Sequence, residues 1–132
     1  MTQKVDHIGI LVSNLDEAIK LYKDCFGAEI DKIETLAERG VKAVVLSLPE
    51  GANLELLEPL PGSNMAKALE KRGEGLHHIA FEVDDIDKEL DRLSEKGIEL
   101  IDKKSHPGLE GMVGFIHPKS IRGVLVELCQ KN

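Results

Sequence analysis

The sequence is poor in aromatic residues, with three Phe, one Tyr and no Trp among 132 residues. Proteins that bind single-stranded nucleic acid stack bases on aromatic side chains, so this composition argues against that class. Positive charge is also scarce, because 17 Lys and Arg stand against 24 Asp and Glu, for a net charge of −7. Binding to nucleic acids or anionic membranes relies on excess positive charge. We therefore expect neither a nucleic-acid partner nor a membrane partner.

Long apolar runs and paired cysteines are missing as well. No stretch approaches the roughly 20 apolar residues that span a bilayer, and no signal peptide is visible, so we expect a cytoplasmic protein. Cys25 and Cys129 lack CxxC or CxxxC spacing, which predicts reduced core residues rather than a metal or redox site. Hydrophobic residues make up 42% of the chain and charged residues 31%, as in a folded globular protein. The length predicts a single domain, 1–132.

An internal repeat is the strongest pattern in the chain. Residues 5–30 and 76–100 carry the same pattern at an offset of 71, which matches His7 with His78. At an offset of 72, Glu55 matches Glu127, and each lies at the centre of a short apolar segment. The repeat units extend over about 4–60 and 75–130. Each unit therefore holds one His and one Glu in equivalent places.

Each repeat begins with a strand-like segment and then changes to helical periodicity. In the first repeat Asn14 has the spacing of an N-cap and Gly27 ends the helix, and in the second Asp85 and Gly97 take these roles. Further strand-like segments follow at 40–48 and 52–58 in the first repeat, and at 98–103, 111–117 and 122–129 in the second. These patterns predict an α+β fold of two βαβββ modules that form a curved, half-open barrel, with a linking helix at about 63–73.

The repeated His and Glu positions predict a metal site. A carboxylate within an apolar segment is costly unless it is paired, protonated or bound to a cation, and this applies to both Glu55 and Glu127. If the two modules pair side by side, pseudo-twofold symmetry brings these two residues together with His7 and His78. Two imidazoles and two carboxylates suit one divalent ion, with positions left open for water or substrate. Cobalt, nickel, zinc, manganese and magnesium all remain open.

Four segments carry a family resemblance: VDHIGILVSNLDEAIKLYKDCFG, ELLEPL, GEGLHHIAFEVDDID and HPKSIRGVLVELC. They resemble the vicinal oxygen chelate superfamily of glyoxalases, bleomycin resistance proteins and dioxygenases, and within it most strongly the methylmalonyl-CoA epimerases. The resemblance implies that His7, His78 and Glu127 bind the metal, with Glu55 where the family has a fourth ligand that can be Gln. It also implies a homodimer that interconverts (R)- and (S)-methylmalonyl-CoA by proton transfer at the carbon α to the thioester.

The sequence indicates one of the two expected catalytic bases and leaves alternatives for the other. Inversion takes a proton from one face of the α-carbon and returns it to the other, so two acid-base groups are expected, and Glu127 is the first. The second Glu expected from the family would fall near Ala43, where the strand-like segment has no carboxylate. Glu38, Glu55 or a water molecule are the alternatives, with Glu38 the leading one. Lys119 and Arg122 are the expected contacts of the coenzyme A phosphates.

Other functions of the same superfamily remain open. A lactoylglutathione lyase of the glyoxalase I type would use the same ligands, although the GEGLHH and HPKS segments favour the epimerase. A metal-free binding or resistance module is disfavoured because all four ligand positions are filled. An extradiol dioxygenase is disfavoured because those enzymes usually carry two such modules and this chain has one.

Overall fold

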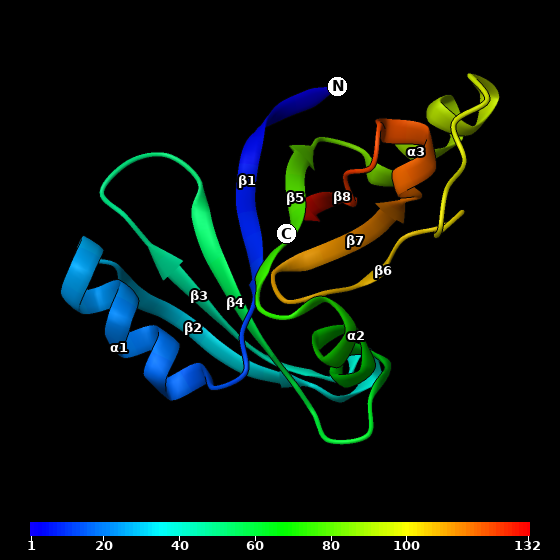
Figure 1. Ribbon diagram of the computed structural model, residues 1–132. Coiled ribbons are helices and arrows are strands. Elements are labelled where there is room, and N and C mark those ends of the chain that lie inside the picture. Colours follow the sequence, from blue (N-terminus) through cyan, green and yellow to red (C-terminus); the bar gives the residue numbers. More distant parts are fainter. The chain divides into compact units, whose positions relative to one another are not determined.

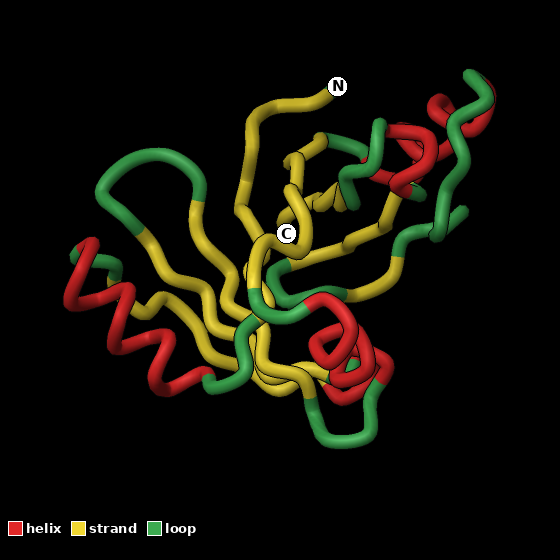
Figure 2. Tube along the Cα trace, in the orientation of Figure 1, coloured by secondary structure: helices red, strands yellow, loops and turns green.

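The computed structural model describes residues 1–132, which pack into two compact units. Unit 1 consists of residues 1–7 and 78–132, and unit 2 of residues 8–77. The first strand, β1 (Thr2–Leu11), contributes residues to both units. Figure 2 shows the mixture of helices and strands in each unit. None of the helices has the length and apolar character of a membrane-spanning segment.

Unit 2 contains an antiparallel sheet of three strands. Strand β2 (Glu29–Leu36) pairs with β3 (Val41–Ser47), and β3 pairs with β4 (Asn53–Pro59). The helix α1 (Leu15–Phe26) lies along this sheet (Figure 1). The apolar stripe of α1 packs on the even-numbered residues of β3 and β4, in a core of Val12, Leu15, Ile19, Ala28, Val44, Leu46 and Leu56. Odd-numbered residues of these strands therefore face away from α1.

The predicted ends of the unit 2 helices are confirmed. The side chain of Asn14 accepts a hydrogen bond from the backbone N–H of Glu17, and α1 ends at Gly27, whose φ of +69° lies in the left-handed region. The linking helix is α2 (Asn64–Arg72), capped by Ser63. A short 3₁₀ helix, η1 (Ala37–Arg39), connects β2 to β3.

The second module repeats the strand order of the first, because β6, β7, β8 and β5 are neighbours in the same order as β2, β3, β4 and β1. Strand β5 (Gly75–Val83) runs parallel to β8 (Val126–Lys131), and β8 is antiparallel to β7 (Gly111–Ile116). The helix α3 (Ile86–Glu95) packs on one face of these strands. The buried core on that face consists of Val83, Ile86, Leu90, Ile116, Val126 and Leu128. Glu127, between the last two residues, points to the opposite face.

The α+β class and the two βαβββ modules are confirmed. The first module is β1-α1-β2-β3-β4 and the second is β5-α3-β6-β7-β8, where β6 is His106–Pro107. The hydrogen-bonding order of the eight strands is β2-β3-β4-β1-β5-β8-β7-β6. The sequence pattern did not locate β2, because almost all its side chains are exposed and no apolar alternation marks it.

Three details differ from the sequence prediction. The strand predicted at 98–103 is wrong, because this segment forms only an isolated bridge, and the carboxylate of Asp102 instead accepts the N–H of Phe115. The strand predicted at 122–129 begins only at Val126, because Arg122, with φ +56°, ends the 3₁₀ helix η2 (Pro118–Ile121) in a left-handed turn. Cys25 is exposed rather than in the core; it lies in the last turn of α1, beyond the buried Leu15 and Ile19, where Phe26 is exposed as well.

In both modules, a side chain at an equivalent position of the last strand binds the N-terminus of the helix. The carboxylate of Glu58 on β4 accepts the N–H of Leu15 at 2.7 Å, and the amide oxygen of Gln130 on β8 accepts the N–H of Ile86 at 2.8 Å. Each bond satisfies one of the free N–H groups of a helix N-terminus. The repeat therefore extends to the way in which helix and sheet are joined.

We expect Glu58→Ala to lower the free energy of unfolding by about 1 kcal/mol, since a half-buried N–H loses its acceptor. Glu58→Gln should retain most of that stability, because Gln130 performs the same task with an amide oxygen. Chemical unfolding of the two variants measures the difference. Equal stability of the alanine variant and the unmodified protein would contradict this role.

Candidate metal centre

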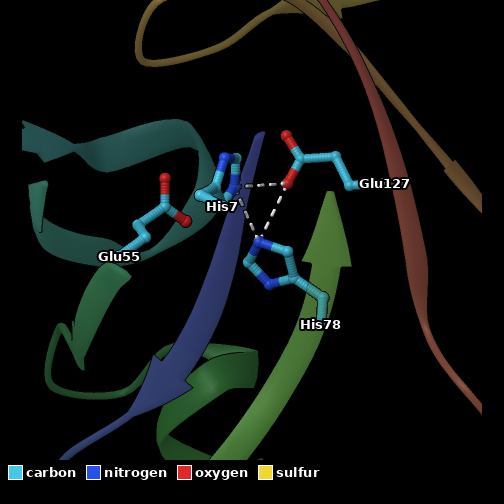
Figure 3. Close-up of side chains that lie close together, drawn as sticks. All are labelled: His7, Glu55, His78 and Glu127. Carbon is cyan, nitrogen blue, oxygen red and sulfur yellow. Dashed lines mark hydrogen bonds and ion pairs between the residues drawn. The ribbon is translucent and has the colours of Figure 1, made fainter. Parts of the chain in front are cut away.

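Three of the predicted ligands come together within unit 1. His7 lies on β1, His78 on β5 and Glu127 on β8, and their side chains point toward one another (Figure 3). The parallel register places Ala80 opposite Glu127, so His78 and Glu127 share the sheet face that points away from α3. The small side chain of Ala80 leaves room on this face.

The ligand atoms converge at short distances. The Nε2 atoms of His7 and His78 are 3.1 Å apart, and they lie 3.4 Å and 2.9 Å from Oε1 of Glu127. The three side chains are 9%, 0% and 2% exposed, respectively. Ligands held about 2.0–2.2 Å from a divalent ion, at tetrahedral to right angles, are about 2.8–3.6 Å from one another. The three atoms therefore fit a divalent metal ion.

The environment keeps Glu127 ionised. Burial alone raises the pKa of this carboxyl group, but the nearby imidazoles of His7 and His78 outweigh burial and hold the pKa well below its ordinary value. A carboxylate must be deprotonated to bind a metal. Glu127 is thus in its ligating form at neutral pH.

Asp6 joins the site, and the sequence analysis missed it. Its Oδ2 atom accepts a hydrogen bond from Nδ1 of His7 at 2.7 Å, and its Oδ1 atom lies 2.7 Å from Nζ of Lys131. Burial raises the pKa of Asp6, but the bonds with His7 and Lys131 lower it overall to about 2. The available signal was a carboxylate directly before a strand His, but strand alternation directs adjacent side chains to opposite faces.

Glu55 occupies in unit 2 the place that Glu127 occupies in unit 1. It is opposite Val45 in the register of β4 with β3, on the sheet face that points away from α1, and it is 3% exposed. Its neighbours on that face include the buried Leu57. His7, Glu55, His78 and Glu127 are all buried, and this group of side chains has the composition of a possible metal site.

The other predicted site residues lie on the surface. Glu38 is exposed in η1. Lys119 is exposed in η2, and Arg122 is exposed in the turn that follows. Their catalytic and substrate-binding roles stay predictions.

Comparison with known proteins identifies the class. Residues 6–115 match the family described as the Glyoxalase/Bleomycin resistance protein/Dioxygenase superfamily, and the chain belongs to this superfamily. The superfamily resemblance of the four sequence segments is thereby confirmed.

Within that superfamily, the chain's relatives include methylmalonyl-CoA epimerases. The mitochondrial methylmalonyl-CoA epimerase of Dictyostelium discoideum is 38% identical, over 97% of this chain and 78% of the relative. The ethylmalonyl-CoA/methylmalonyl-CoA epimerase of Cereibacter sphaeroides is 38% identical, over 98% of this chain and 99% of the relative. The crystal structure of the Mycobacterium tuberculosis methylmalonyl-CoA epimerase has a TM-score of 0.94 at 35% identity, and the alignment covers 99% and 89% of the two chains.

Proposed function

We propose that this protein is a metal-dependent methylmalonyl-CoA epimerase. The observation that carries the proposal is the convergence of the ligand atoms of His7, His78 and Glu127, in a chain whose near full-length relatives bear that name. A solved methylmalonyl-CoA epimerase in complex with methylmalonyl-CoA and NH4+ is 34% identical to this chain, with a TM-score of 0.94. This similarity supports an acyl-CoA as the substrate.

We propose that His7, Glu55, His78 and Glu127 hold one divalent metal ion. Burial and the repeat-equivalent position of Glu55 support it as the fourth ligand. Two neutral imidazoles and two carboxylates carry a charge of −2, which balances the charge of a divalent ion. When bound, the ion supplies Lewis-acid stabilisation of the enolate oxygen that develops as the α-proton leaves.

The carboxylates of the chain would then move the proton. Glu127, held in its ionised form, takes the α-proton from one face of the substrate carbon. Glu38, in the exposed η1 helix, is the proposed group that returns a proton to the opposite face. Lys119 and Arg122 are exposed in the turn between β7 and β8, and we propose that they bind the phosphates of coenzyme A.

A paired assay tests the function. The purified protein should carry one divalent ion per chain and epimerise methylmalonyl-CoA, while methylglyoxal with glutathione should give no lactoylglutathione. Lyase activity without epimerase activity would assign the site to the glyoxalase I reaction instead. Absence of any stoichiometric metal after competitive loading would reject the metal centre.

We further propose a cytoplasmic homodimer. Strand β2 lies at one edge of the strand order, and it exposes Ile30 and Ile33 at 44% and 49%. Long edge strands with apolar side chains are commonly covered by another element or subunit. Sedimentation velocity at micromolar concentration should show about twice the 14.5 kDa mass of one chain. A single species with the mass of the monomer would contradict the proposed dimer.

The similarity to the enzyme of the bacterium Cereibacter sphaeroides supports the cytoplasmic location.

A further inference from the structure

A short chain of polar contacts leads from His7 to the end of β8. Asp6 and His7 are neighbours on β1 and both are buried. One oxygen of Asp6 accepts the hydrogen bond from Nδ1 of His7, and the other lies 2.7 Å from the ammonium group of Lys131. The two oxygens of Asp6 are thus divided between an imidazole and a cation.

The contact with Asp6 determines which nitrogen of His7 carries the proton. An ionised carboxylate can only accept hydrogen bonds, so Nδ1 of His7 must be the donor. When a metal is bound, the imidazole is neutral, and with its proton on Nδ1 its free lone pair is on Nε2. Nε2 is the atom that lies 3.1 Å from Nε2 of His78 and 3.4 Å from Oε1 of Glu127. Asp6 therefore directs the ligating lone pair of His7 toward the other ligand atoms.

Lys131 in turn keeps the carboxylate of Asp6 in place. A buried carboxylate bonded only to a neutral group is costly, and a paired ammonium group offsets much of that cost. Lys131 also lies on β8, the strand that carries Glu127. Its contact with Asp6 thus connects the strand of one ligand to the strand of another.

This arrangement occurs in only one of the two repeats. At the offset of 71 that matches His7 with His78, the position equivalent to Asp6 is His77. The second His is therefore preceded by an imidazole and not by a carboxylate. The contacts of Asp6 with His7 and Lys131 therefore occur in the first repeat alone, and the internal repeat does not predict them.

We propose that Asp6 and Lys131 are positioning residues for His7: Asp6 fixes the orientation and tautomer of the imidazole, and Lys131 anchors Asp6. The inference rests on the proposed metal function and assigns residues that act on it through His7. A carboxylate that receives the second N–H of a ligating imidazole raises the basicity of the imidazole, and its loss typically weakens metal binding about 10- to 100-fold.

Metal affinity is the first test. The dissociation constant for Zn²⁺ is measured by competition with a chelator, for the full-length protein and for Asp6→Asn, Asp6→Ala and Lys131→Met. Both Asp6 variants should bind Zn²⁺ about 10- to 100-fold more weakly, and Lys131→Met should show a smaller loss. Lys131→Arg, which keeps the cation, should restore most of the affinity. Glu82→Gln removes a carboxylate whose charge also acts on Lys131 but which is not bonded to His7, and it should stay within about twofold of the unmodified protein.

Proton exchange supplies a readout that a purely structural role would leave unchanged. In the Zn²⁺-loaded, ¹⁵N-labelled protein, the Nδ1–H proton of His7 should exchange slowly with water, because it is buried and bonded to Asp6. Exchange should become faster in Asp6→Ala and in Lys131→Met.

The outcomes separate this inference from the proposed function. If the unmodified protein binds no metal, the proposed site and the inference both fail. If it binds Zn²⁺ while Asp6→Asn and Lys131→Met bind equally tightly, with unchanged exchange at His7, the metal site stands and the positioning role is overturned. If Asp6→Asn does not fold, the Lys131 variants decide by the same two measurements.

Discussion

The His78→Ala variant is expected to lose the divalent ion and at least about 10³-fold in kcat/KM for methylmalonyl-CoA, since the Lewis acid that stabilises the enolate is worth several kcal/mol. His7→Ala should behave in the same way. The Nε2 atoms of both residues lie within 3.4 Å of Oε1 of Glu127, so removal of either opens the proposed site. Elemental analysis after dialysis gives the metal content, and the epimerase assay gives the rate.

His77→Ala is the matched control for this experiment. It changes the same residue type one position earlier on β5, where the side chain points to the other face of the strand. This variant should retain both metal and activity. Circular dichroism should show that all three variants keep the fold. A His78→Ala protein with full metal occupancy and normal turnover would contradict the assignment of His78 as a ligand.

Glu38→Gln is expected to abolish inversion while hydrogen exchange at the α-carbon continues. Glu127 can still remove and return the proton on its own face, but no group delivers a proton to the other face. In deuterium oxide the variant should therefore incorporate deuterium into one epimer of methylmalonyl-CoA and form almost none of the other. Mass spectrometry follows the exchange, and a coupled assay specific for one epimer follows the inversion.

Loss of inversion in Glu38→Gln identifies Glu38 as a catalytic base only if the variant binds as much metal as the unmodified protein. Glu38 is exposed in η1 and is not a proposed ligand, so Glu38→Gln should keep the ion. Glu50→Gln, an exposed carboxylate between β3 and β4, is the control and should epimerise normally. If Glu38→Gln inverts at the normal rate with metal bound, the second base must be sought at Glu55 or at a water molecule. Because Glu127 is also a proposed metal ligand, the activity of Glu127→Gln must be interpreted together with the metal content of that variant.

The helix ends and the candidate ligands could be predicted from the sequence, because they depend on local chemistry and on the internal repeat. Asn14 and Gly27 mark the ends of α1 because an N-cap side chain and a left-handed residue act on neighbouring backbone groups. The repeat matched His7 with His78, and the structure brings both to Glu127. It also singled out Glu55, since a carboxylate within an apolar strand is unusual wherever the strand lies.

The boundaries of irregular strands were predicted less accurately, because they depend on contacts with other segments of the chain. The segment 98–103 has strand composition, yet Asp102 accepts the N–H of Phe115 and the ladder is interrupted. β2 has almost no buried face, so its pairing with β3 leaves no periodic signal in its residues.

The repeated modules, their helix ends and the residue types of the candidate metal centre follow from the sequence, because these features depend on neighbouring residues and on periodicity. The contacts of Asp6 with His7 and Lys131 cannot be found without the folded structure. The side chains of Asp6 and Lys131 come from opposite ends of the chain, and Asp6 should face away from His7 by strand alternation. Only the packing of β1 and β8 in unit 1 brings the carboxylate, the imidazole and the ammonium group within hydrogen-bonding distance.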